Sequence, residues 1–222
     1  MPPHHALKPL RVRLGIAAVA FAILPSFFAS QTFAADAADI DKLKAGLQKM
    51  QTTTRKLSYS QKTWEKKGKK ESAFRADCYW MGQTTIRMDI VEGNGKGGVA
   101  VLKNGKVTGF LKGILSFAKM TYDPKDSAVL GLRGQGMPSA GFMDDVKIIL
   151  SHWDNGKVSF EGDKAVMEYT GPDKLPMKMW VKSDGSVVLK TETYENGAIV
   201  MRSEYSRVNY AATFDAAKVF DP

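Results

Sequence analysis

Two long runs of alternating apolar and polar residues, separated by a stretch of different composition, constrain the fold of this chain most. The first run extends over residues 57–111 and the second over residues 158–205. Alternation with a period of two is typical of strands that bury one face. Asn104-Gly105, Asp184-Gly185 and Asn196-Gly197 separate such segments and are typical of tight hairpin turns. The pattern predicts roughly ten strands, joined mostly by hairpins.

A segment before the first run has the period of a helix. Its apolar residues fall at intervals of three, four and three positions behind Asp36 or Asp39; they are Ile40, Leu43, Leu47 and Met50. Residues spaced in this way form one stripe along an α-helix, and an aspartate before them is a good N-cap. The spacing therefore predicts a first amphipathic helix.

A second helical pattern lies between the two alternating runs. It begins after Pro138-Ser139 and stops at Asn155-Gly156, and a shorter apolar piece at 111–120 precedes it, separated by Asp123-Pro124. Its wide apolar face consists of Phe142, Met143, Val146, Ile149, Leu150 and Trp153.

These elements together predict the fold class. A single antiparallel sheet of roughly ten strands curls, and its concave face must be closed by itself or by helices. The two predicted helices are suited to closing it. The sequence therefore predicts an α+β fold, a strongly curved and incomplete antiparallel β-barrel closed by an N-terminal helix and a mid-chain helical lid.

The first 34 residues have the pattern of a cleaved export signal. Lys8, Arg11 and Arg13 precede an apolar stretch at 14–29, and Thr32-Phe33-Ala34 is a small-x-small cleavage site. No cysteine follows the apolar stretch closely enough to be lipidated at a new N-terminus. We predict a signal peptide at 1–34 and one periplasmic domain at 35–222.

Basic residues are in modest excess and are concentrated between Lys42 and Arg75. The chain has 32 Lys and Arg against 23 Asp and Glu, and one run reads Lys66-Lys67-Gly68-Lys69-Lys70. No aromatic residues interleave with these lysines and no recognition motif accompanies them, so a nucleic-acid partner is not expected. The run is interpreted as a solvated hairpin tip, with attraction to anionic lipid head groups or an acidic protein as the alternative.

The single cysteine, Cys78, belongs to an alternating segment. Phe74, Ala76 and Trp80 share its side of the strand, whereas Arg75 and Asp77 lie on the other side. A thiol among apolar side chains has a raised pKa and reacts slowly. Cys78 is therefore predicted to be buried and structural.

The chain has few residues that could do chemistry. His152 is the single histidine after the leader, and it ends a predicted helix, so a pair with Cys78 is the one nucleophile and base combination available. Asp144 and Asp145 are adjacent on a helix and diverge by about 100°. The glycine-rich stretch 93–98 lacks the spacing of a phosphate loop and is interpreted as a long hairpin turn. We predict no catalysis, no metal site and no cofactor.

Several short motifs resemble the periplasmic lipoprotein carriers of the LolA type. The N-terminal helix has Leu47 in its last turns, and Leu57-Ser58-Tyr59-Ser60-Gln61 opens the first strand. That family also has two successive strands followed by a hairpin turn. The similar segments here are Ile86-Arg87-Met88, the strand at 99–102 and the turn Asn104-Gly105-Lys106. The endings Thr213-Phe214-Asp215 and Val219-Phe220-Asp221-Pro222 resemble its C-terminal segment. The stretches 92–97, 113–117, 132–134 and 139–142 are closer still to a little-characterised exported branch of the lipoprotein-sorting superfamily.

The resemblance implies a hydrophobic cavity that takes an acyl chain of a lipid or lipoprotein. It implies a monomeric, non-catalytic periplasmic carrier for transport towards the outer membrane, with membrane-bound donor and acceptor proteins as further partners. The alternative is a regulatory module that senses lipid or mislocalised lipoprotein in the same cavity and passes this to a partner protein. The candidate cavity residues are Leu47, Trp80, Met88, Phe142, Val146, Ile149, Met177 and Met179.

The family also holds its lid shut with a basic residue next to a proline near the end of the second or third strand. Trp80-Met81-Gly82-Gln83 stands at that place and has neither residue, so this latch is not carried over. Arg87 lies one strand later. It either takes the place of the latch's basic residue or points outward from its strand.

An acyl chain needs a protein escort through water for energetic reasons. Each methylene removed from water contributes roughly 0.8 kcal/mol, so a 16-carbon chain is held in its membrane by about 12 kcal/mol. Methionines such as Met88, Met143, Met177 and Met179 give flexible linings for such a chain, although the same residues at these periods also fill an ordinary core.

Overall fold

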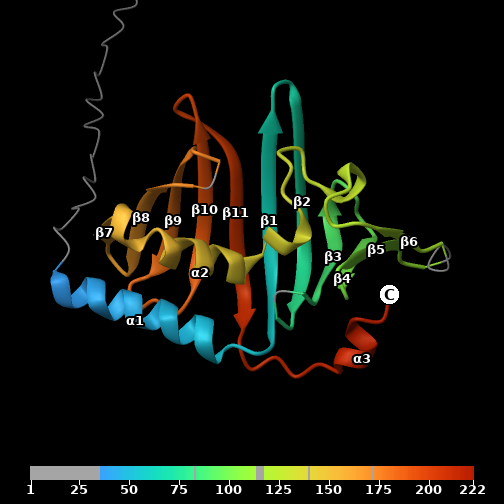
Figure 1. Ribbon diagram of the computed structural model, residues 1–222, viewed down its shortest axis with the longest axis horizontal. Helices are drawn as coiled ribbons and strands as arrows, with labels where there is room; N and C mark the ends of the chain where they lie inside the picture. The colour runs from blue at the N-terminus through green and yellow to red at the C-terminus, as the bar shows by residue number, and fades with distance from the viewer. Residues whose placement is uncertain (1–35, 83, 114–117, 140, 172) are drawn as a thin grey trace, which may run out of the picture. The chain divides into compact units, whose positions relative to one another are not determined.

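In the part of the chain that the structure describes, eleven antiparallel strands form one sheet (Figure 1). The computed structural model describes residues 36–222, except residues 83, 114–117, 140 and 172. The predicted leader at 1–34, Gln83 of the latch position and most of the 113–117 motif lie outside the described residues. Among the helices of the described ranges, none is long and apolar enough to cross a membrane.

The strands follow one another in the order β6-β5-β4-β3-β2-β1-β11-β10-β9-β8-β7. The first half of the sheet consists of β1 (Leu57–Lys67), β2 (Lys70–Trp80), β3 (Ile86–Gly93), β4 (Gly98–Lys103), β5 (Lys106–Leu111) and β6 (Met120–Tyr122). The second half consists of β7 (Lys157–Glu161), β8 (Lys164–Thr170), β9 (Pro176–Lys182), β10 (Val188–Glu195) and β11 (Ala198–Asn209). The helices are α1 (Ala37–Thr53), α2 (Phe142–Ser151) and α3 (Ala216–Val219), with short 3-10 turns η1 (Ser127–Val129), η2 (Met137–Ser139) and η3 (Trp153–Asn155).

The connectivity explains why α2 lies across the sheet. The chain leaves the first half at the edge strand β6 and enters the second half at β7, the opposite edge. Ten steps between neighbouring strands amount to about 48 Å along the sheet, and residues 123–156 have to span this width. They cross one face, where Phe142 at the start of α2 contacts Tyr59 and Tyr205 of β1 and β11, and His152 at its end contacts Tyr169 of β8.

Helix α1 has the cap and the apolar stripe that its sequence predicts. The Asp36 side chain accepts a hydrogen bond from the Ala38 amide, and Leu43, Leu47 and Met50 are buried. On this helix, Gly46 lies against the turn between β9 and β10. A Cβ at Gly46 would lie 2.0 Å from the Asp184 carbonyl oxygen, so any larger residue would push α1 away from this turn.

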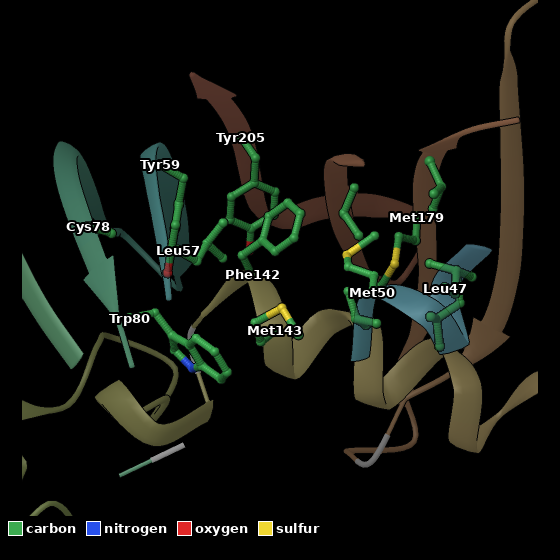
Figure 2. Packing of buried hydrophobic residues seen from close by; sticks show 14 of the residues in the cluster. Leu47, Met50, Leu57, Tyr59, Cys78, Trp80, Phe142, Met143, Met179 and Tyr205 are labelled. Carbon is green, nitrogen blue, oxygen red and sulfur yellow. The ribbon is translucent and has the colours of Figure 1, made fainter. Parts of the chain in front are cut away.

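The main core lies between the helices and one face of the sheet (Figure 2). Helix α2 buries Phe142, Met143, Val146 and Ile149, which is the apolar face that its spacing predicts. The Phe142 ring packs 5.2 Å from the ring of Tyr205 and 5.7 Å from the ring of Tyr59, measured between centroids. The predicted α+β class is therefore confirmed, with both helices at their predicted places.

A smaller core lies on the opposite face and involves the end of the chain. Phe220 is buried against Val99 and Val101 of β4, and Phe214 packs beside it with the ring centroids 5.7 Å apart. The phenylalanines of the C-terminal motifs thus cover the face of the sheet that the helices α1 and α2 leave free.

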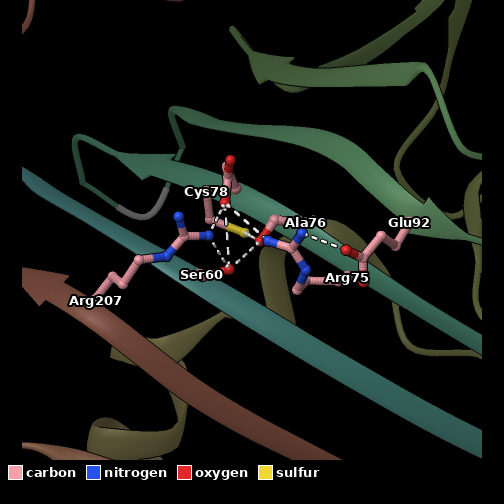
Figure 3. A network of polar contacts seen from close by, with 7 residues as sticks. Ser60, Arg75, Ala76, Cys78, Glu92 and Arg207 are labelled. Carbon is pink, nitrogen blue, oxygen red and sulfur yellow. Dashed lines mark hydrogen bonds and ion pairs between the residues drawn. The ribbon is translucent and has the colours of Figure 1, made fainter.

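The first and last strands join the two halves of the sheet, and this junction is irregular. The pairing of β1 with β11 shifts register between Ser58 and Ser60, and Arg207 at the bulge has a positive φ of 53°. Its guanidinium donates to Ser60 Oγ at 3.0 Å and to Asp77 Oδ1 at 2.8 Å, while Arg75 donates to Glu92 Oε1 at 2.6 Å (Figure 3). This network covers the bulge on the face opposite to α2.

The hairpin predictions are confirmed. Asn104-Gly105 and Asn196-Gly197 both have positive φ at their two residues, which is the geometry that tight hairpins require. The stretch 93–98 connects β3 to β4, and the lysines of the run at 66–70 are exposed around the tip of the β1–β2 hairpin.

The predicted strong curvature is wrong. The sheet has two free edges, β6 and β7, and it is neither closed nor strongly curled. The physical reason is that residues 123–156 cross the whole apolar face, so this face is buried by helices and loops and does not have to wrap around itself.

Candidate functional site

The side chains of β1 on the helix-covered face change character along the strand. Leu57 and Tyr59 are apolar and buried, whereas Gln61, Thr63 and Glu65, which continue on the same face, are polar and also buried. Burying polar groups costs free energy unless they are hydrogen-bonded. The second part of this face is therefore built differently from a simple apolar core.

A cavity of about 510 Å³ lies over that second part. The sheet forms its floor, the segment 128–137 forms one wall, and Asp145 in the first turn of α2 reaches its rim. Its apolar lining comes from β2, β3, β4 and the wall segment, and includes Phe74, Met88, Ile90, Ala100, Leu130 and Met137. This volume lies within the range of about 300–1,000 Å³ that is usual for small-molecule sites.

The polar lining comes mainly from β1, β10 and β11. Tyr205 donates a hydrogen bond of 2.5 Å to Asp145 Oδ2, and Gln61 Nε2 donates to Thr63 Oγ1 at 3.0 Å. Thr63 Oγ1 lies 3.4 Å from Ser203 Oγ. The cavity thus has one apolar side and one hydrogen-bonding side.

Burial perturbs the carboxyl group at the rim. Desolvation raises the pKa of Asp145 to about 7, against the lowering effect of the Tyr205 hydrogen bond. Desolvation also raises the pKa of the neighbouring Asp144 to about 6. Asp145 is therefore partly protonated near neutral pH and is able to donate as well as accept a hydrogen bond.

The wall segment is fastened to the top of β1. The Glu65 carboxylate accepts a hydrogen bond from the Arg133 amide at 3.2 Å, and the Arg133 guanidinium donates to the Lys66 carbonyl at 2.9 Å and to Glu195 at 3.1 Å. A Cβ at Gly131 would lie 3.0 Å from both Glu65 carboxylate oxygens, so this position leaves little room for a side chain. These contacts hold 131–133 at one end of the cavity.

All eight candidate residues from the sequence pack in or against the main core. Met88 also lines the cavity. The others contribute to the packed region beneath α2 and α1: Leu47, Trp80, Phe142, Val146, Ile149, Met177 and Met179. A ligand could contact these seven only if α2 moved, so their role in binding stays a prediction.

The residues that sequence analysis missed are those of the wall segment and of the polar side. Thr63 and Glu65 follow Leu57, Tyr59 and Gln61 at a period of two, so the alternation of β1 already placed them on the inward face. No comparable pattern in the sequence indicates that Leu130 and Met137 line the cavity, because their segment reaches it only by crossing the sheet.

A second hollow, of about 590 Å³, lies on β1, β2 and β11. Lys62, Arg75, Arg202 and Glu204 line it beside Trp64, and Arg75 and Arg202 form ion pairs with Glu92 and Glu192. Such a density of charge is unsuited to an apolar ligand, so the cavity beside α2 is the better candidate site.

No protein-family model and no curated protein sequence matches this chain. Several solved structures are similar to it at low sequence identity. A LolA superfamily protein from Nitrosomonas europaea is similar at 13% identity and a TM-score of 0.37, over 81% of this chain and 95% of that one. The lipoprotein LppX from Mycobacterium tuberculosis is similar at 10% identity and a TM-score of 0.41, over 82% and 100%. An uncharacterised conserved protein from Thermus thermophilus is similar at 10% identity and a TM-score of 0.45, over 82% and 90%.

The LolA superfamily protein belongs to the family that the sequence motifs resemble. The likeness is in the arrangement of helices and strands alone. Any function has to be inferred from the residues of this chain.

Arg87 does not act as a latch for α2 in this structure. Its side chain donates to Asp89 Oδ1 at 2.6 Å and to the Val219 carbonyl at 2.8 Å, and Lys112 also pairs with Asp89. Arg87 points to the face opposite to the helices, as one of the two sequence interpretations had it, but it is covered there. It fastens the C-terminal segment to β3.

The described residues do not assemble a recognisable catalytic group. The Cys78 thiol contacts Gln61 and Ala76, whereas His152 Nδ1 lies 3.0 Å from the Ile148 carbonyl and its ring packs against Tyr169. Cys78 and His152 therefore have separate surroundings. Among the described ranges, no three His, Cys, Asp or Glu side chains are grouped so that they could hold a metal ion.

Cys78 is expected to resist a water-soluble thiol reagent in the native protein and to react fully once the protein is unfolded. Its side chain is buried at 1% exposure, and desolvation raises the pKa of the thiol far above its ordinary value. Because the thiolate is the reactive form, native labelling should be slow at pH 7 to 8. Mass spectrometry after timed iodoacetamide treatment, with and without guanidinium chloride, measures both rates. Rapid labelling without denaturant would contradict the packing described for β2.

Proposed function

We propose that this chain is a non-catalytic periplasmic binding protein that holds the acyl chain of a lipid or lipoprotein in the cavity beside α2, and that it carries this ligand towards the outer membrane. The observation that supports the proposal best is the continuous apolar side of the cavity. Phe74, Met88, Ile90 and Ala100 extend it across three adjacent strands, and Met137 covers it. An acyl chain removed from water needs such a surface.

The proposal includes the leader and the lid. Export through the signal peptide at 1–34 would bring the domain at 35–222 into the compartment that separates two membranes. The polypeptide that covers the cavity, from the wall segment to α2, has its apolar residues on the sheet, and hydrogen bonds fasten it at 131–133 and at Asp145. Movement of α2 would open the side chains packed beneath it to the cavity and let a longer chain enter.

Filling the cavity is expected to abolish acyl-chain binding without unfolding the protein. Ala100 is partly buried on β4 and lines the cavity, so Ala100→Phe places a ring where the chain would lie. Delipidated wild type should bind a palmitoyl ester that carries an environment-sensitive fluorophore in a saturable manner, and Ala100→Phe should bind it at least about tenfold more weakly, a difference of about 1.4 kcal/mol. Ala198→Phe, at an exposed position on β11, is the matched control and should bind as the wild type does.

Thermal unfolding of all three proteins separates lost binding from lost folding. A well-folded, delipidated wild type that shows no saturable binding would exclude the acyl-chain proposal. Unchanged binding in a folded Ala100→Phe protein would place the ligand elsewhere.

A further inference from the structure

The cavity beside α2 has a chemical asymmetry that an acyl chain alone does not explain. Thr63, Ser203 and Thr191 are neighbours across β1, β11 and β10, because Ser203 pairs with each of the other two. Their exposures are 8%, 6% and 2%, and all three line the cavity. Thr63 Oγ1 lies within hydrogen-bond distance of Gln61 Nε2 and Ser203 Oγ, and a floor that contacted only hydrocarbon would need no such row of hydroxyls.

The ionisable residues that line the cavity on its rim and at the top of β1 are acidic. Glu65 and Asp145 line it, and none of the described lining residues is a lysine or an arginine. Glu65 accepts from a backbone amide and Asp145 from a tyrosine hydroxyl, so neither carboxyl group has a cation as its partner in these contacts. A carboxylate or phosphate head group inside this cavity would meet carboxyl groups and no counter-charge, which disfavours an anionic ligand.

One lining group lacks a hydrogen-bond donor. The side-chain oxygen of Gln135, in the wall segment, is buried and has no partner within the described part of the chain. A buried carbonyl oxygen without a donor is costly, and a ligand hydroxyl or amide N–H would satisfy it. The wall, the floor and the rim therefore each have an oxygen atom that can accept a hydrogen bond.

The two kinds of lining lie mostly on different strands. The apolar residues come mainly from β2, β3 and β4, with Met201 of β11 as an exception. The hydroxyl row lies on β1, β11 and β10, while Ser72 of β2 and Asn94 after β3 are polar residues outside it. A ligand that contacts both must itself be apolar along one part and polar at the other.

We infer that the ligand is a single-chain amphiphile with an uncharged head group that donates hydrogen bonds, such as the glycerol hydroxyls of a monoacylglycerol. The chain lies over β2 to β4, and the head group lies over the hydroxyl row and toward Gln135. This inference rests on the proposed function and specifies the class of ligand for the same cavity.

A competition experiment on the delipidated protein tests the inference. Three ligands with the same chain displace the fluorescent palmitoyl ester: 1-monopalmitoylglycerol has uncharged donors, palmitate is an anion, and methyl palmitate is uncharged without donors. We expect 1-monopalmitoylglycerol to compete at least about tenfold more strongly than either of the others. Equal or stronger competition by palmitate would overturn the exclusion of anions, and equal competition by methyl palmitate would overturn the need for a donor.

A variant ties the preference to the hydroxyl row. Thr191→Val keeps the shape of the side chain and removes its hydroxyl, so it should lower the affinity for 1-monopalmitoylglycerol several-fold and leave that for methyl palmitate unchanged. Thr170→Val, at an exposed position on β8, is the matched control and should change neither. If the ratio of the affinities for 1-monopalmitoylglycerol and methyl palmitate is the same in Thr191→Val as in the wild type, the placement of the head group is contradicted. Failure of all three ligands to displace the probe, or failure of the probe to bind, would count against the proposed function itself.

Discussion

Replacing Phe142 by alanine is expected to lower the free energy of unfolding by about 3–5 kcal/mol, the range found for large aromatic residues in well-packed cores. Phe142 has no exposed surface, and its ring packs against the rings of Tyr59, Tyr205 and Tyr210 at centroid distances of 5.7, 5.2 and 6.1 Å. The loss combines the transfer of the ring to water, the cavity left behind and the lost aromatic contacts. Urea unfolding of the domain at 35–222, followed by tryptophan fluorescence, measures it.

The matched control for Phe142→Ala is Leu111→Ala, which truncates a side chain that is 46% exposed at the end of β5. This change should stay within about 0.5 kcal/mol of the wild type, as is usual for surface substitutions. A loss below about 1 kcal/mol for Phe142→Ala would show that α2 does not pack on the sheet in solution as it does in the structure.

The local elements of this fold could be predicted because their signals are local. Asp36 and the spacing of Leu43, Leu47 and Met50 are sufficient for α1, and Asn104-Gly105 is sufficient for the turn between β4 and β5. Each depends on interactions within a few residues. Cys78 was predicted to be buried for the same reason, since the alternation of β2 fixes its face.

The long-range features could not be predicted in the same way. Whether eleven strands curl into a barrel depends on what covers their apolar face, and this was decided by the path of residues 123–156 from one edge of the sheet to the other. Nothing in the composition of the wall segment 128–137 indicates that it lines a cavity. The sequence therefore predicted a ligand site at the apolar face of α2, where the structure has packed side chains. It did not predict the cavity beside that helix.

The polar side of the candidate site could be predicted only in part from the sequence. The period-two alternation of β1 continues through Thr63 and Glu65 on the inward face, but the role of a polar residue there cannot be inferred until its neighbours on other strands are known. The register that brings Ser203 between Thr63 and Thr191 shows that the polar positions form one row. Asp145 was predicted to diverge from Asp144, and it does so by reaching Tyr205.

The stability of the wild type is expected to fall as the pH rises from about 4 to about 7, and Asp145→Asn is expected to remove most of this dependence. Desolvation raises the pKa of Asp145 to about 7, whereas an aspartate in the unfolded chain titrates near 3.9. Between these values the folded state holds a proton that the unfolded state has released. The free energy of unfolding then decreases with pH, with a slope that approaches about 1.4 kcal/mol per pH unit for one proton.

The other groups around Asp145 determine how much of this slope is seen. Asp144 on the same helix adds to the slope, since its own pKa is raised to about 6. The Tyr205 hydroxyl lowers the pKa of Asp145, and Lys147 lowers that of Asp144. The position of Asp145 in the first turn of α2 favours its charged form by about 0.3–1 kcal/mol, which is smaller than the effect of desolvation. Tyr59 and Tyr169 also lie near enough for the Asp145 charge to raise the pKa of each hydroxyl.

Asp145→Asn keeps an acceptor for the Tyr205 hydroxyl and cannot become charged. At pH 8 this variant should therefore be more stable than the wild type by on the order of 2–4 kcal/mol, and at pH 4 the two should be nearly equal. Asp154→Asn, an exposed aspartate in η3, is the control and should give a curve parallel to that of the wild type. Urea unfolding at intervals of one pH unit measures all three curves. A wild-type curve that runs parallel to the Asp145→Asn curve from pH 4 to pH 7 would show that the carboxyl group is solvated, and that α2 stands further from Tyr205 in solution than the 2.5 Å hydrogen bond requires.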